Sequence, residues 1–339
     1  MTMSNTEPNQ NFPARAQKPL RWRDNAVLIA LIAFVVFGLV GLAAATGWQE
    51  TMAQISKLSW LQVLGLLALS LANYGFRGIR WHIFSRRLGL NLSFAQNSRH
   101  FFGGLAMVVT PGRLGELIRM RWLMRETGWS FEKTAPLLLV DRASDLAAMA
   151  LILAVTLSLS TSAIPGAAAM TVLALGAALV ATRPRLLAGA ANVGYALLGR
   201  ASRLFARIRT AARALSSFSD LATMTVSTVI GVIGWLAEAL AFYLLLMWLS
   251  ADIGFATAGA IFIFSTLAGG LTGAPGGIGG AEAVMIALLS LEGLPLEVSL
   301  PATAIIRLTT LWFAIAIGVL IFPIAERHSK MKQNALEEI

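Results

Sequence analysis

The feature that most constrains this chain is a glycine- and proline-rich break inside an apolar stretch. The break runs from Gly269 to Glu282 and contains Pro275 among closely spaced glycines. Proline removes a backbone donor and clashes with the preceding turn, and glycine weakens a helix. A helix should therefore break here, at or near membrane depth, where free backbone groups are tolerated only against protein or a water-filled cavity. The alternative is a plain loop between two membrane helices.

The composition places this break in a polytopic membrane protein. Of 339 residues, 57% are hydrophobic and 13% are charged. The formal net charge of +10 is attributed to basic residues that set the topology in the membrane and attract the chain to anionic lipid headgroups. The chain has no cysteine, and its three histidines have no metal-like spacing. We therefore expect no metal site and no cofactor. No Walker loop or serine-nucleophile elbow is present, so we expect no enzyme activity, although an intramembrane transferase stays open.

Apolar runs that alternate with basic clusters predict the topology. We expect an all-α polytopic membrane protein with about six full transmembrane helices, two re-entrant helical hairpins in an inverted repeat, and both termini inside. The dense basic clusters fall on the predicted inner side, as the positive-inside rule requires. The expected location is the bacterial cytoplasmic (inner) membrane.

The predicted organisation has a single integral membrane domain, over residues 25–323. Two tails flank it: a disordered basic cytoplasmic tail over 1–24 and a cytoplasmic tail over 324–339. Within the domain, repeat 1 spans about 94–160, a basic amphipathic cytoplasmic segment spans 183–217, and repeat 2 spans about 256–323. We expect no nucleic-acid binding by the basic segment, because it lacks interleaved aromatic residues and a binding fold.

Two broken stretches match each other in order and spacing. The predicted hairpin breaks are Pro111, Gly112 and Gly115 in the first copy, and Pro275, Gly276, Gly277 and Gly279 in the second. In each copy a glutamate follows the break, and an arginine early in a long helix lies about thirty residues after the proline. Because three crossings separate the copies, they should point in opposite directions. Such inverted repeats are typical of transporters.

Ionisable residues near the breaks and inside the apolar helices are the candidate substrate-binding residues, because such groups are costly in a membrane and face the interior. They are Arg113, Glu116, Arg142, Glu238, Glu282 and Arg307. Arg142 and Arg307 could bind a lipid phosphate through bidentate contacts. They could also form ion pairs with the glutamates that lock each hairpin against its neighbouring helix. Glu238 is either a proton-coupling carboxylate or a protonated, hydrogen-bonded one.

Two further groups of charged residues have simpler interpretations. Asp141 and Asp145 are expected to neutralise Arg142 or to cap the start of its helix. Arg77, Arg80 and Trp81 are interpreted as headgroup anchors at the inner surface.

Four short motifs in the same order resemble the flippase-like membrane domain family, which includes the transmembrane region of lysylphosphatidylglycerol synthases. They are Pro-Gly-Arg-Leu-Gly-Glu at 111–116, Asp-Arg-Ala-Ser-Asp-Leu at 141–146, Pro-Gly-Gly-Ile-Gly-Gly-Ala-Glu at 275–282, and Arg307 within 304–308. The resemblance covers nearly all of 26–323 and implies an inner-membrane protein of lipid metabolism. In the synthases the membrane domain is taken to flip the aminoacylated lipid, and a separate soluble domain transfers the amino acid. This sequence contains no such domain, so aminoacyl transfer is not expected.

Together these features predict a translocase for a membrane lipid or a lipid-linked headgroup. The expected partners are a phospholipid or lipid-linked substrate and the membrane, with a homo-oligomer or an enzyme partner also open. The alternative function is a non-catalytic membrane partner or scaffold for a lipid-modifying or glycosyl-transferring enzyme.

Overall fold

The computed structural model describes residues 48–108, 110, 114–160, 164–198, 215–218 and 220–337. All regular secondary structure within these ranges is helical, which confirms the all-α prediction. The predicted tail over 1–24 and the first predicted break at Pro111 and Gly112 lie outside the described residues.

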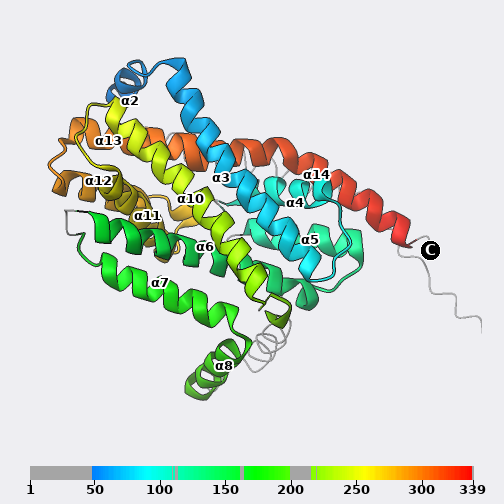
Figure 1. The fold of residues 1–339 in the computed structure, drawn as a ribbon. Helices are drawn as coiled ribbons and strands as arrows, with labels where there is room; N and C mark the ends of the chain where they lie inside the picture. The colour runs from blue at the N-terminus through cyan, green and yellow to red at the C-terminus, as the bar shows by residue number, and fades with distance from the viewer. Residues whose placement is uncertain are drawn as a thin grey trace, which may run out of the picture.

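The helices follow one another along the chain with short connections. They are α2 (Trp48–Ile55), α3 (Trp60–Arg87), α4 (Phe94–Gly104), η1 (Leu105–Met107), α5 (Leu114–Thr127), α6 (Phe131–Leu159), α7 (Ala167–Thr182), α8 (Pro184–Leu198), η3 (Leu215–Phe218), α10 (Leu221–Trp248), α11 (Phe255–Leu271), η4 (Pro275–Gly277), α12 (Gly280–Leu291), α13 (Leu296–Arg307), η5 (Leu308–Trp312) and α14 (Phe313–Glu337). The long helices α3 and α10 lie side by side and run in opposite directions (Figure 1).

Within the described residues, helix length and composition identify fewer spans than the six or so that the sequence predicts for the whole chain. Among the described residues, α10 and the continuous helical stretch over 296–335 are long and apolar enough to cross a membrane. The pair α7 and α8, bent by 102° at residue 183, would make a third span if it is one broken crossing. The other long helices, α3 and α6, carry several charged residues, which lower their hydropathy.

The second predicted break is a helical hairpin formed by α11 and α12 around η4. Backbone φ angles at Gly276, Gly277 and Gly279 are +63°, +69° and +84°, a region that residues with a Cβ rarely adopt. The two arms can approach because position 269 is glycine, where a Cβ would come within 2.6 Å of the Ala281 Cβ. The local sequence therefore dictates both the turn and the close packing of its arms.

The two halves of the chain pack in a reciprocal way. Helix α4 of the first half packs on α14 of the second, while α11 of the second half packs on α6 of the first. Helices α3 and α10 have 28 residues each. Each of them also contacts the next α-helix after a connection of equal length, over 88–93 and 249–254. The matching order therefore begins one helix earlier than the repeats predicted from the sequence.

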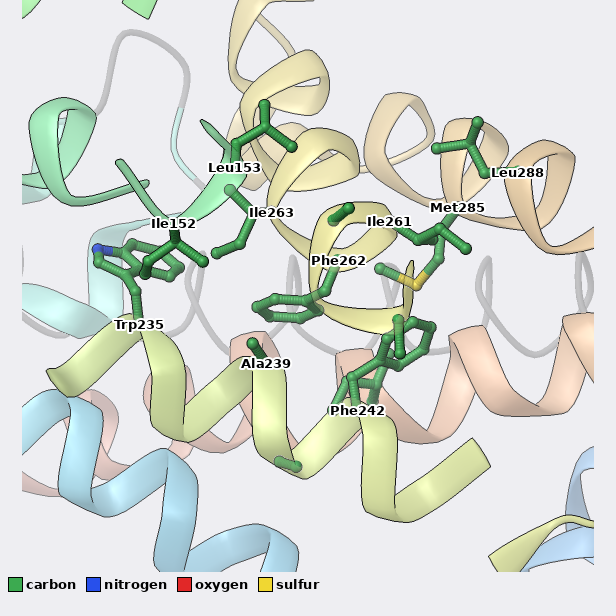
Figure 2. Close-up of a cluster of buried hydrophobic side chains, with 14 of the residues drawn as sticks. Ile152, Leu153, Trp235, Ala239, Phe242, Ile261, Phe262, Ile263, Met285 and Leu288 are labelled. Atoms are coloured by element: carbon green, nitrogen blue, oxygen red, sulfur yellow. The ribbon is translucent and has the colours of Figure 1, made fainter. Parts of the chain in front are cut away.

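The main hydrophobic core lies where α10 meets α6, α11 and α12 (Figure 2). Phe242 packs against Phe262 with ring centroids 5.8 Å apart, and Met285 of α12 lies beside them (Figure 2). Small residues such as Ala239 and Gly259 bring the backbones of α10 and α11 together. Such close approach is the main source of helix association where lipid surrounds the protein.

Candidate functional site

A buried group of charged side chains joins α3, α5 and α6. We call it the arginine–aspartate cluster; its members are Arg77 and Arg80 of α3, Arg119 of α5, and Asp141, Arg142 and Asp145 of α6. Charged groups are tolerated away from water only when they are paired and hydrogen-bonded. The cluster is therefore both a structural junction and a concentration of charge inside a largely apolar protein.

Arg80 is the centre of the arginine–aspartate cluster. Its side chain is fully buried, and its Nη2 lies 2.7 Å from Asp141 Oδ1 and 2.6 Å from Asp145 Oδ1. The same nitrogen lies 3.3 Å from the carbonyl oxygen of Asp141. The two aspartates are one helical turn apart on α6, so both carboxylates reach α3 from the same face. Arg80 thus ties α3 to α6.

Asp145 accepts hydrogen bonds from side chains on three helices. Besides Arg80, Arg77 donates from Nη2 to Oδ2 at 2.9 Å, and Arg142 donates from Nη1 to the same oxygen at 3.4 Å. The indole nitrogen of Trp235 on α10 donates to Oδ1 at 3.3 Å. Asp145 therefore holds α3, α6 and α10 at one point.

Aromatic rings replace water around two of the arginines. The guanidinium of Arg77 lies 5.4 Å from the ring centroid of Trp235, and that of Arg119 lies 4.5 Å from Phe101 and 5.3 Å from Trp81. Cation–π contacts of this kind favour a cation that has lost its hydration. Arg119 fits because residue 104 is glycine, where a Cβ would meet the Arg119 side chain.

Two arginines of the cluster keep donor capacity that the described residues do not use. The Nε and Nη1 atoms of Arg80 and the Nε atom of Arg77 are buried and have no hydrogen-bond partner in the described ranges. A buried donor without a partner is costly. A guanidinium fork matches the oxygens of a phosphate or a carboxylate. The cluster therefore has the chemistry to accept a further anion.

A second buried ion pair locks the hairpin of α11 and α12. Glu282 accepts a hydrogen bond from the backbone N–H of Gly279 at 2.7 Å and another from Nε of Arg307. Arg307 also donates from Nη2 to the carbonyl oxygen of Gly276 at 2.9 Å. Here the structure contains the locking ion pair that the sequence left open as one of two possibilities. We call it the hairpin lock.

The carboxylate of Glu238 lies within electrostatic range of both the arginine–aspartate cluster and the hairpin lock. It is buried on α10 next to Asn73, and both Arg77 and Arg307 act on its carboxylate. Tyr74 lies in the same region, and its hydroxyl donates to the carbonyl oxygen of Thr310 at 2.6 Å. Thr310 belongs to η5, a π-helical turn that directly follows the hairpin lock. Such turns are rare and frequently occur at functional sites.

A comparison with protein-family models decides what kind of protein this is. The model described as "Lysylphosphatidylglycerol synthase TM region" matches residues 26–318. The chain belongs to the lysylphosphatidylglycerol synthase TM region family. The resemblance identified from the four motifs is thereby confirmed, and the chain is a membrane protein.

Two similar relatives are each described as a "UPF0104 membrane protein" of Methanothermobacter thermautotrophicus. One match is 25% identical over 322 residues and covers 85% of this chain and 94% of the relative. The other is 28% identical over 104 residues and covers 31% of each.

In this member of the lysylphosphatidylglycerol synthase TM region family, the predicted site residues fall into separate groups. Arg142 lies at the edge of the arginine–aspartate cluster, Glu282 and Arg307 form the hairpin lock, and Glu238 is in electrostatic range of both. Arg113 and the side chain of Glu116 lie outside the described residues. The structure therefore places Arg142 and Arg307 in two different sites.

The central residues of the cluster were missed by sequence reasoning. Arg80 and Trp81 are fully buried, and Arg77 is mostly buried, so the prediction of headgroup anchors is wrong for them. A signal was present in the sequence, because Asn73, Tyr74, Arg77 and Arg80 recur at helical spacing on α3. Such a polar stripe indicates a face that packs against protein.

A further buried carboxylate joins α4 to α5. Glu126 accepts a hydrogen bond from Nε2 of His100 at 3.0 Å and another from Gln96 at 3.0 Å. Burial alone would raise the pKa of Glu126. The hydrogen bond from His100 and the nearby positive charge, including that of Arg99, outweigh burial, so the pKa lies below its ordinary value.

This lowered pKa predicts a pH dependence of stability. A carboxyl whose pKa is depressed in the folded state stabilises the fold above its ordinary pKa, and this contribution is lost as the pH falls through the folded value. Glu126→Gln should therefore lower the free energy of unfolding by about 2 kcal/mol at neutral pH, with the deficit shrinking in acid. Thermal unfolding in detergent at several pH values measures this. Asp252→Asn, at an exposed position, is the matched control. A deficit that does not change with pH would contradict the assignment.

Proposed function

We propose that the protein translocates a membrane lipid or lipid-linked substrate with a phosphate headgroup. The observation that carries the proposal is the arginine–aspartate cluster, in which Arg80 is fully buried and has unused donors on Nε and Nη1 within the described residues. A phosphate is the headgroup element common to membrane phospholipids that a guanidinium recognises best. Nothing in the proposal requires a covalent step.

The phosphate would enter where the cluster is least buried. The side chain of Arg142 is 29% exposed and that of Arg77 is 11% exposed, whereas Arg80 is fully buried. Arg77 and Arg142 share one oxygen of Asp145. An incoming phosphate would compete with that oxygen for both guanidinium groups, so binding exchanges one anionic partner for another rather than creating an unpaired charge.

The hairpin lock offers a second cation on the same path. Arg307 and Arg77 are both in electrostatic range of the Glu238 carboxylate, and we take Arg307 as the second cation that the phosphate would meet. We further propose that the two halves form an inverted repeat in the cytoplasmic membrane, with about six crossings and hairpins that enter from opposite faces. The reciprocal packing of α4 on α14 and of α11 on α6 supports this arrangement.

The experiment compares translocation rates in proteoliposomes. Fluorescent phosphatidylglycerol is reduced by dithionite from one side, and wild type is compared with Arg142→Ala and Arg307→Ala at equal amounts of monodisperse protein. Each variant loses a charge-assisted contact to phosphate, so we expect the rate to fall about tenfold or more. Arg185→Ala, on the exposed surface of α8, should keep the wild-type rate. Equal rates in wild type and both variants would refute the mechanism.

A further inference from the structure

A glycine lets α3 and α10 make close contact. A Cβ on Gly234 of α10 would lie 2.9 Å from Asn73 Oδ1 and 3.6 Å from the Cα of Asn73 on α3. Both residues stand at the same position along their 28-residue helices, so this contact joins equivalent points of the two halves. Because the helices run in opposite directions (Figure 1), residues one turn before Asn73 lie on the same side of the contact as residues one turn after Gly234.

On that side, a buried carboxylate lies among polar groups that have no partner. Glu238 follows Gly234 by one turn, and Ser70 precedes Asn73 by one turn. Glu238 is 5% exposed, and Ser70 and Asn73 are fully buried. Asn73 acts on the Glu238 carboxylate, yet neither of its amide atoms has a partner at hydrogen-bond distance within the described ranges, and Ser70 Oγ has none either. Buried polar groups normally find such partners. We call these three residues, Ser70, Asn73 and Glu238, the Glu238 site.

Charged groups on three other helices act on Glu238. Arg77 of α3 and Arg307 of α13 favour its ionised form, and Asp145 of α6 opposes it. Tyr74 of α3 is a further titratable group in the same region. Helix α11, which also packs on α10, has no titratable residue. The negative charge of Glu238 therefore depends on two guanidinium groups.

These two guanidinium groups are also the cations that the proposed function assigns to the lipid phosphate. A phosphate held by Arg77 or Arg307 offsets the positive charge of that side chain and brings a negative charge close to Glu238. The carboxylate then loses part of its compensation. A buried carboxylate without compensation is so costly that it takes up a proton instead.

We propose that Glu238 is a proton-binding site that takes up one proton from water when a lipid phosphate binds to Arg77 or Arg307. The proton adds to a carboxylate oxygen and is released when the phosphate leaves. The inference rests on the proposed function and names a proton gradient as its energy source. Carboxylates inside a membrane domain commonly serve as proton relays.

The surroundings of Glu238 favour a proton over a metal ion. A metal ion would add a further positive charge beside two guanidinium groups. In the described part of the chain, no group of three or more histidine, aspartate or glutamate side chains could hold a metal. A proton needs only the carboxylate itself.

Proton uptake on lipid binding tests the Glu238 site. Dihexanoyl phosphatidylglycerol is added to the full chain in detergent and weak buffer, and a pH-sensitive dye records the protons taken up. Where Glu238 is ionised, wild type should take up as much as about one proton per bound lipid, so its affinity should rise up to about tenfold for each unit by which the pH falls. Glu238→Gln, which has the shape of the protonated side chain, should bind the lipid without proton uptake and without this pH dependence. Glu297→Gln, at an exposed position, is the matched control and should behave as wild type.

Three results would overturn the proposal. One is lipid binding by wild type without proton uptake, which can be read without any variant. Another is uptake that persists in Glu238→Gln. The third is an affinity that depends on the sodium concentration instead of the pH, because that result would identify a metal cation as the bound ion.

Translocation under a pH gradient separates this inference from the proposed function. In proteoliposomes, acid on the side that the lipid leaves should accelerate wild type several-fold and leave Glu238→Gln unchanged. Translocation by wild type that does not respond to the gradient would refute proton coupling and leave the proposed function standing. Proton uptake on lipid binding without any translocation would refute the proposed function and leave the Glu238 site standing.

Discussion

Replacement of Asp145 by asparagine is expected to destabilise the protein by about 3–5 kcal/mol, enough to leave little folded protein after purification. The carboxylate accepts from Arg77, Arg80 and Arg142, and from the indole of Trp235. Asparagine keeps the shape of the side chain but removes the negative charge. The arginines then remain buried with less compensation, which costs far more than the loss of one surface ion pair.

The yield of monodisperse protein and its thermal unfolding in detergent measure this effect. Asp252→Asn makes the same chemical change at an exposed position and should leave stability within about 0.5 kcal/mol of wild type. If the cluster acts as an electrostatic unit, Arg77→Gln introduced into the Asp145→Asn protein should recover part of the loss, because it removes one uncompensated charge. A stable Asp145→Asn protein would show that its carboxylate does not hold the helices together.

Replacement of Gly318 by alanine is the second change with a large expected effect, about 3 kcal/mol. A Cβ at this position of α14 would come within 2.0 Å of the backbone nitrogen of Ala106 and 2.6 Å of the carbonyl carbon of Leu105. Both are backbone atoms, so no side chain can rotate away. The helix α14 would have to separate from η1, and the packing of Trp122 and Phe322 beside it would loosen.

A matched glycine replacement distinguishes this clash from a general effect on helices. Gly176→Ala, in α7, adds the same methyl group where nothing lies within 4 Å. Because alanine favours helix over glycine, this control should be neutral or stabilising by up to about 1 kcal/mol. Thermal unfolding of the two variants decides the matter: equal stabilities would contradict the close contact between α14 and η1.

The parts of the fold that depend on local backbone rules could be predicted from the sequence. Pro275 and the glycines that follow it dictate a turn with positive φ angles, and the hairpin of α11 and α12 is present. The pairing of Glu282 with Arg307 was one of two predicted possibilities, as an ion pair that locks the hairpin against its neighbouring helix. For these two residues the structure contains the ion pair, one of the two roles that we predicted from the sequence.

The arginine–aspartate cluster could not be predicted in the same way. Arg77 and Arg80 follow an apolar run and precede Arg86 and Arg87, a pattern typical of a headgroup anchor. Only the packing of α3 against α6, more than sixty residues away in sequence, turns Arg80 towards Asp141 and Asp145. Helical periodicity can indicate that a polar face is buried, but it does not specify the partner.

The central proposal is that the arginine–aspartate cluster receives a lipid headgroup in a membrane domain whose two hairpins enter from opposite faces. The most direct measurement is the accessibility of single cysteines in intact cells, which is free of background because the chain has no cysteine. Leu291→Cys, at the exposed end of α12, should react with a membrane-impermeant maleimide added outside. Ser130→Cys, at the exposed start of α6, should react only after the cells are opened. A Leu291→Cys protein that reacts only after opening would place both hairpins on one side and contradict the account.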